Sequence, residues 1–116
     1  MTLRLTPAML EAAYEYLRST PPFRGWRLPH ADDVEFRITD AIDYMGLWEK
    51  NGVQHRISVS DRRVGHTKTL MVVMAHEMVH IRQDRDGTDK GPDHNDAFRK
   101  HARRICRVHG FDPKEF

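Results

Sequence analysis

The residues with the clearest chemical meaning are His76, Glu77 and His80, in the stretch His76-Glu77-Met78-Val79-His80. Residues four apart on a helix project from the same face, so the two imidazoles could bind one metal ion. The carboxylate beside the first imidazole could then reach a water molecule on that ion. The spacing therefore indicates a hydrolytic zinc site, with His76 and His80 as ligands and Glu77 as the catalytic base.

A catalytic zinc ion needs a third protein ligand and one open position for water. A downstream glutamate is nearly excluded, because Glu115 is the only glutamate after Glu77. Asp84 follows His76 by eight residues, which is roughly 12 Å along a helix axis at about 1.5 Å per residue. Asp84 is therefore too far away to share the ion and could only act as an acceptor behind a ligand.

Two residues remain as candidates for the third ligand. Asp86 occupies the ligand position of the metzincin pattern, but Gln83 stands where that pattern has a glycine to turn the chain. His94 follows a loop rich in glycine and aspartate and lies at the start of the final helix, from which it can reach the metal. We choose His94 and keep Asp86 as the alternative. His101, seven residues further along, could lie behind the ligands.

Three helices and three strands are expected from the pattern of apolar residues. The helices are expected over residues 7–18, 68–84 and 93–109, and the strands over residues 34–39, 44–50 and 53–60. Asn51-Gly52 favours a tight hairpin turn between the last two strands. This order predicts one α+β domain over residues 1–116, in which a small, mostly antiparallel three-stranded sheet follows an N-terminal helix and precedes the motif helix and a C-terminal helix.

The helix expected over residues 68–84 is apolar around much of its circumference and should lie in the core. Its apolar residues are Leu70, Val72, Val73, Met74, Ala75, Met78, Val79 and Ile81. Two imidazoles and a carboxylate on such a helix are costly unless they bind a metal or form hydrogen bonds. His55, on a strand, is expected to be a hydrogen-bonded histidine rather than a ligand.

The composition excludes several classes of protein. A hydrophobic content of 39% and a charged content of 31% suit a soluble globular domain, and no apolar run approaches the roughly 18 residues of a membrane span. The first seven residues lack the apolar core of a signal peptide, so we expect a cytoplasmic protein. Cys106 is the only cysteine, which excludes an intramolecular disulfide and a cysteine-rich zinc knuckle.

The expected C-terminal helix carries a strip of basic residues. These are Arg99, Lys100, Arg103, Arg104 and Arg107. Such a strip is either a solvated face or a surface that contacts DNA phosphates, and both interpretations stay open at this point. The net charge of +2 does not by itself imply nucleic-acid binding.

The motif, the Gly/Asp-rich loop and the stretch His94-Asn95-Asp96-Ala97-Phe98-Arg99-Lys100-His101 together resemble the SprT-like metalloprotease family, which includes the Spartan proteases. Members of that family are similar in having HE-hydrophobic-x-H, a loop of comparable length, and then H-x-x-x-F opening a helix. The resemblance is specific over residues 70–106, and the preceding helix and hairpin are compatible with it in layout.

The resemblance implies a minimal zincin-like fold with one Zn²⁺ per chain, held by His76, His80 and His94, and Glu77 as catalytic base. It also implies cleavage of peptide bonds in a protein or peptide substrate, which in Spartan-type members is bound or crosslinked to DNA. Asn95 replaces the common glycine after the third histidine, and residues 1–116 contain no zinc ribbon. A family member of this size resembles bacterial or phage-borne forms.

In the expected mechanism, Glu77 takes a proton from the metal-activated water and passes it to the leaving amine. The edge of the strand over residues 53–60 could bind an extended substrate by strand addition. Candidates for stabilising the oxyanion are Tyr44, His101 and Arg99. The alternative function is a non-catalytic, zinc-stabilised DNA-binding or scaffold module, which would ordinarily have a fourth protein ligand and no need of Glu77.

Overall fold

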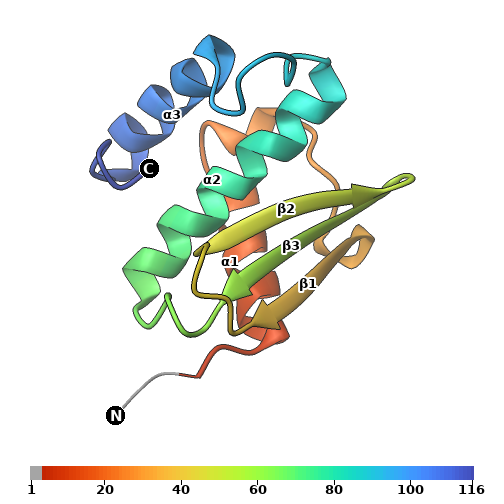
Figure 1. The fold of residues 1–116 in the computed structure, drawn as a ribbon. Coiled ribbons are helices and arrows are strands. Elements are labelled where there is room, and N and C mark those ends of the chain that lie inside the picture. The colour runs from red at the N-terminus through yellow and green to blue at the C-terminus, as the bar shows by residue number, and fades with distance from the viewer. Residues whose placement is uncertain (1–3) are drawn as a thin grey trace.

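The computed structural model describes residues 4–116, and helix α1 (Pro7–Arg18) begins where the sequence predicts (Figure 1). Thr6 caps the helix, because its hydroxyl accepts a hydrogen bond of 3.2 Å from the main-chain nitrogen of Met9, and Pro7 occupies the first helical position. Leu10, Tyr14 and Leu17 are buried along one face, as their helical spacing predicts. This face packs α1 into the core.

The sheet contains β1 (Val34–Thr39), β2 (Gly46–Asn51) and β3 (Gln54–Ser60) in the order β1-β3-β2. Strands β2 and β3 are antiparallel and joined at Gly52, whose φ of 63° suits the hairpin turn. Strands β1 and β3 are parallel, so the sheet is mixed rather than mostly antiparallel. The reason is that β2 does not pair with β1. The hairpin inserts β3 between these two strands, and β3 then runs in the same direction as β1.

This topology corrects two expectations about the hairpin. Strand β3 is central, with a neighbour on each side, so the stretch from residue 53 to residue 60 offers no free edge. The edge next to the motif helix belongs to β2 instead. Val53 lies in the turn and is 92% exposed, so β3 starts one residue later than the strand expected over residues 53–60. Ile57 and Val59 are buried.

Helix α2 (Thr67–Asp86) packs against α1, α3 and the sheet and contains the motif residues (Figure 1). Its apolar residues expected in the core are buried. Gly87, with φ of 71°, ends the helix. Within the part of the chain that the structure describes, no helix combines the length and the apolar character needed to cross a membrane.

Helix α3 (Asp96–His109) starts three residues later than the sequence led us to expect. Asn95 is its N-cap, because the side-chain oxygen accepts a hydrogen bond of 3.0 Å from the main-chain nitrogen of Phe98. Phe98, Ile105 and Cys106 are buried against the rest of the molecule. His94 therefore lies on the loop before α3 and not on the helix itself.

Candidate metal centre

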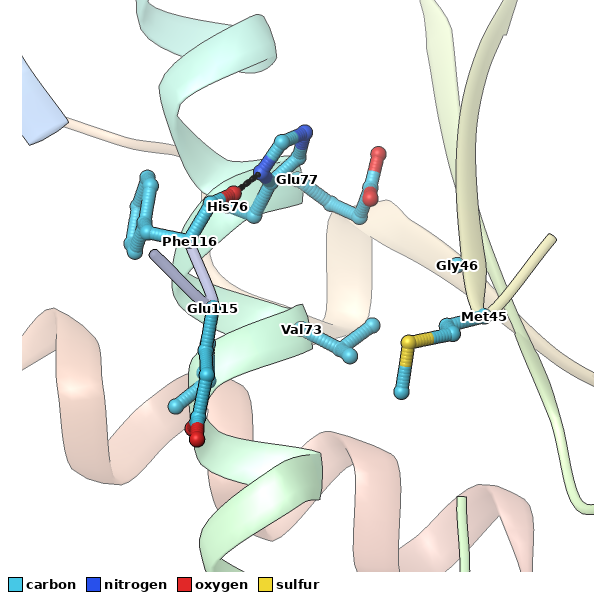
Figure 2. Close-up of a pocket in the computed structure, with 8 residues that line it drawn as sticks. Met45, Gly46, Val73, His76, Glu77, Glu115 and Phe116 are labelled. Atoms are coloured by element: carbon cyan, nitrogen blue, oxygen red, sulfur yellow. Dashed lines mark hydrogen bonds between the residues drawn. The ribbon is translucent and has the colours of Figure 1, made fainter. Parts of the chain in front are cut away.

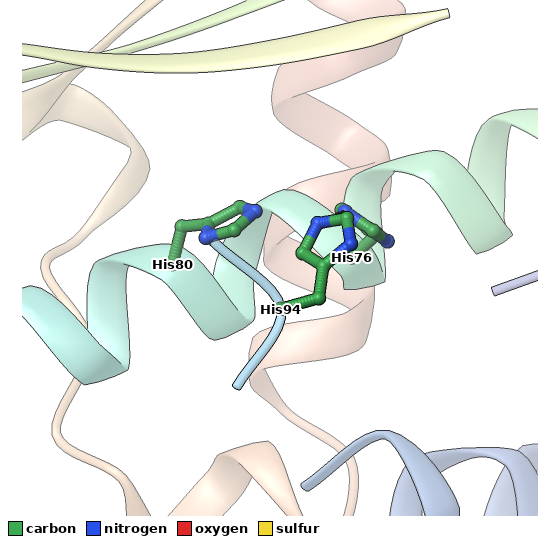
Figure 3. A group of neighbouring side chains, drawn as sticks. All are labelled: His76, His80 and His94. Atoms are coloured by element: carbon green, nitrogen blue, oxygen red, sulfur yellow. Dashed lines mark hydrogen bonds between the residues drawn. The ribbon is translucent and has the colours of Figure 1, made fainter. Parts of the chain in front are cut away.

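Three imidazoles meet beside α2 (Figure 3). His76 and His80 come from successive turns of α2, and His94 comes from the loop before α3. One ligand atom from each residue lies within 4.8 Å of the other two, and Nε2 of His76 is 3.1 Å from Nε2 of His94. The three histidines are therefore close enough together to bind one metal ion.

Burial keeps the two histidines of α2 neutral at physiological pH. Removal from water lowers the pKa of His76 to about 4 and also lowers the pKa of His80. The main-chain oxygen of Phe116 opposes this effect at His76 to a smaller extent. A neutral imidazole has a nitrogen lone pair to give to a metal, so both side chains are in the state that a ligand requires.

The loop that carries His94 is held in place by Gln83 and Asn95. Nε2 of Gln83, a fully buried side chain, donates hydrogen bonds to the main-chain oxygen of Thr88 at 2.9 Å and to Oδ1 of Asn95 at 3.0 Å. Nδ2 of Asn95 donates to the main-chain oxygens of Thr88 and Lys90, at 2.8 and 3.0 Å. These bonds fix both ends of the loop next to α2.

Neither loop-holding residue is predicted from the sequence. There, Gln83 is only the residue at a glycine position of the metzincin pattern, and Asn95 is only a departure from the pattern of the family that the sequence resembles. Gln83 lies four residues after the apolar Val79, so its place on the apolar face of the helix was the signal for a buried amide that needs partners. An asparagine three residues before Phe98 was the signal for an N-cap.

Glu77 is buried beside the three histidines. Burial raises the pKa of Glu77 to about 8, with a smaller contribution in the same direction from Asp93 and a smaller opposing one from the main chain of Trp48. Among residues 4–116, Glu77 forms no ion pair. The carboxylate therefore lacks a compensating positive charge from the described chain.

Strand β2 closes the other side of the site. Gly46 lets its main chain pass so near to α2 that a Cβ atom there would lie 3.1 Å from Oε2 of Glu77. The indole of Trp48 stacks on His80, with ring centroids 6.0 Å apart, and its Nε1 donates a hydrogen bond of 3.0 Å to Nδ1 of His55. His55 is thus hydrogen-bonded, as the sequence predicted, and it anchors a residue that contacts the site.

Two cavities of about 200 Å³ each open on either side of His76 and Glu77. One is lined by the three histidines together with Leu47 and Trp48 of β2. The other has Met45, Val73 and Phe116 in its walls (Figure 2). Glu77 therefore borders both cavities.

The aspartates considered as ligands or acceptors are engaged elsewhere. Asp86 accepts a hydrogen bond of 2.5 Å from Nε of Arg82, and it is not in the group of residues at metal-binding distance. Asp84 accepts one of 2.9 Å from Nζ of Lys50. The structure therefore groups His94, and not Asp86, with the two histidines of the motif.

The residues considered for the oxyanion already have other partners. The ring of His101 lies against Trp26, with centroids 4.9 Å apart. The hydroxyl of Tyr44 donates to Thr39, and Arg99 pairs with Asp96 and donates to the main-chain oxygen of His94. The contact of Arg99 thus places it among the groups that hold the His94 loop.

The donor set suits a divalent cation such as Zn²⁺. Two nitrogen ligands about 2.0–2.1 Å from a tetrahedral zinc ion are about 3.3 Å apart, close to the 3.1 Å between Nε2 of His76 and of His94. A positive charge nearby would stabilise the ionised form of Glu77, which burial otherwise disfavours. Neither the protein-family models nor the curated proteins compared with the sequence give a match.

Proposed function

We propose that the chain is a zinc-dependent metalloendopeptidase, with His76, His80 and His94 as the ligands of one Zn²⁺ and Glu77 as the catalytic base. The observation that carries the proposal is the convergence of three imidazoles from two segments beside a buried carboxylate with a cavity in front of it. Zinc in such a site supplies Lewis acidity toward a peptide carbonyl and lowers the pKa of water.

Glu77 performs the proton transfers in this proposal. Its carboxylate accepts a proton from the attacking water and then gives it to the nitrogen of the leaving amine. A buried carboxyl with a raised pKa suits both steps, because it holds a proton more readily than an exposed one. Trp48 stacks on His80, and the main chain at Gly46 passes close to Glu77, so β2 borders the site on the side of the sheet.

The edge strand β2 supports a peptide substrate. It pairs with β3 on one side only, and its residues Gly46, Leu47 and Trp48 line the cavity in front of the histidines. An extended peptide could add to this edge through main-chain hydrogen bonds, as peptides do in many recognition modules. The scissile bond would then lie next to Glu77. The proposal therefore assigns substrate binding to β2 rather than to the strand over residues 53–60.

DNA-associated proteins are the substrate class that the surface of α3 favours. The five basic residues expected to form a strip, Arg99, Lys100, Arg103, Arg104 and Arg107, are all exposed on this helix. Exposed arginines and lysines on one helix suit contact with DNA phosphates. The competing function is a non-catalytic, zinc-stabilised DNA-binding or scaffold module. It would give no reason for a buried glutamate next to the histidines.

The decisive experiment replaces Glu77 with glutamine. The amide has nearly the same shape but cannot act as a base, so the variant should bind about one zinc ion per chain and melt like the unchanged protein while losing cleavage of an unfolded protein. Zinc content, thermal melting and a gel assay measure the three quantities. Unchanged cleavage would refute the peptidase mechanism, and equal absence of cleavage in both proteins would favour the non-catalytic module.

The third ligand and the role of DNA are tested in the same assays. His94→Ala should abolish zinc binding, and Asp86→Ala should preserve it, since only His94 belongs to the group at metal-binding distance. The reverse result would favour Asp86 as ligand. Cleavage of a DNA-binding protein should increase when single-stranded DNA is added and should lose that increase at high salt. Cleavage that ignores DNA would remove the proposed substrate class.

A further inference from the structure

The segment after α3, residues 111–116, returns to α2 and is called the return segment below. Gly110, with φ of 74°, ends α3, and the main-chain nitrogen of Phe111 still bonds to the oxygen of Cys106 at 3.1 Å. A turn follows, in which the main-chain nitrogen of Glu115 bonds to the oxygen of Asp112 at 2.9 Å. The turn brings Phe116 against His76 (Figure 2).

Phe116 contacts His76 in two ways. Its main-chain oxygen lies 2.5 Å from Nδ1 of His76, across a sequence separation of 40 residues. Its ring lies 5.4 Å from the imidazole and 6.0 Å from the ring of Phe98, measured between centroids. The half-buried side chain also packs against the hydrophobic core. The ring contacts therefore hold the main-chain oxygen in place.

The hydrogen bond determines which nitrogen of His76 carries the proton. A main-chain oxygen can only accept, so Nδ1 must be the donor. In a neutral imidazole the other nitrogen, Nε2, then has a free lone pair. This Nε2 is the atom that lies 3.1 Å from Nε2 of His94, inside the group of three histidines. The contact with Phe116 thus selects the tautomer that a metal ligand needs.

His76 differs in this respect from the two other histidines. Within residues 4–116, no protein acceptor bonds to the imidazole of His80. The polar neighbours of the His94 imidazole in the same range are His76 and an Asp93 oxygen 3.5 Å away. Aromatic contacts hold those two rings instead, from Trp48 on His80 and from Phe98 on His94. His76 is therefore the histidine whose orientation depends on the return segment.

We propose that Phe116 is a positioning residue for the metal centre, whose main-chain oxygen holds His76 as the Nδ1–H tautomer with Nε2 directed at the metal position. The proposal rests on the zinc site proposed above, and it assigns the return segment a role in metal affinity. Groups behind a ligand that fix its orientation typically change metal affinity by about 10–100-fold when they are removed.

The first test measures the tautomer of His76 in the metal-free chain of residues 1–116 by nitrogen-15 NMR of the imidazole rings. The proposal requires a protonated Nδ1 and an unprotonated Nε2 at neutral pH. The same measurement on a chain that ends at Lys114 should show His76 as a mixture of the two tautomers. A protonated Nε2 in the chain of residues 1–116 would overturn the proposal, whether or not the shortened chain folds.

The second test measures zinc affinity by competition with a coloured chelator. The chain that ends at Lys114 should bind zinc about 10–100-fold more weakly than the chain of residues 1–116. Phe116→Leu is the matched control, since it keeps the main-chain oxygen and an apolar side chain, and its affinity should stay within about threefold. Equal affinity in all three proteins, or an equal loss in both variants, would overturn the proposal.

These results are separable from the fate of the proposed peptidase. The tautomer and the zinc affinity do not depend on cleavage, so an inactive protein with the expected tautomer and affinities would support the role of Phe116 and refute only the peptidase. If the chain of residues 1–116 bound no zinc, the metal site itself would be refuted, and with it the role of Phe116.

Discussion

Replacing Gly46 with alanine tests the close approach of β2 to the site. A Cβ atom at this position would lie 2.5 Å from Cγ1 of Val73 and 3.1 Å from Oε2 of Glu77. Carbon atoms in contact prefer a separation of about 3.5–4.0 Å, so the new methyl group would overlap Val73 by about 1 Å. Val73 is buried on α2 and β-branched, which leaves it one favoured side-chain conformation. The strand or the helix must therefore move.

We expect this overlap to lower the free energy of unfolding by about 1–3 kcal/mol, the usual cost of an extra methyl group in a packed interior. At roughly 4 °C per kcal/mol for a domain of this size, the melting temperature should fall by about 4–12 °C. Displacement of Glu77 should also reduce cleavage, while zinc content stays at one ion per chain. Urea unfolding, thermal melting and the cleavage assay measure these effects.

Two variants make the test specific to this contact. In Gly65→Ala the added Cβ would meet nothing within 4 Å, so the free energy of unfolding should stay within about 0.5 kcal/mol. Val73→Ala removes the overlapping methyl group, so combining it with Gly46→Ala should cost about 1–2 kcal/mol less than the sum of the single changes. Additive costs, or a Gly46→Ala variant as stable as Gly65→Ala, would refute the reasoning.

Two further predictions concern Gln83, which holds the His94 loop, and Glu15, which pairs with Arg18 on α1. Gln83→Leu removes the two hydrogen bonds that Gln83 donates to the His94 loop. The variant should bind zinc about 10–100-fold more weakly in a chelator competition. Unchanged affinity would show that the position of the loop does not depend on Gln83. The Arg18 guanidinium, with help from the main-chain nitrogen of Ala31, holds the pKa of Glu15 below its ordinary value. The stability that Glu15 contributes is therefore present above the ordinary glutamate pKa, and it is lost as the pH falls through the lowered pKa of the folded protein. Glu15→Gln removes this contribution, so the urea midpoint of the variant should fall less steeply below about pH 4.5. The exposed Glu11, replaced in the same way, should leave the fall unchanged.

The local elements could be predicted from the sequence because each depends on neighbouring residues. Thr6-Pro7 determines the start of α1 through a side-chain cap and a fixed φ angle. Gly52 permits the positive φ of the hairpin turn. The start of α3 was predicted too early, since the Asn95 cap decides it. The parallel pairing of β1 with β3 could not be predicted, because it depends on contacts between strands distant in the sequence.

Residue types and spacing in the sequence were enough to predict the three histidines that the structure brings together. The spacing of His76 and His80 follows from the pitch of one helix, and the choice of His94 followed from the shortage of other ligands. The contacts that hold these side chains arise only in the folded chain. Gln83 and Phe116 act on the site through folded loops, and Trp48 acts through strand pairing. Hydropathy patterns report which faces are buried, whereas a hydrogen bond across 40 residues exists only once the chain has folded.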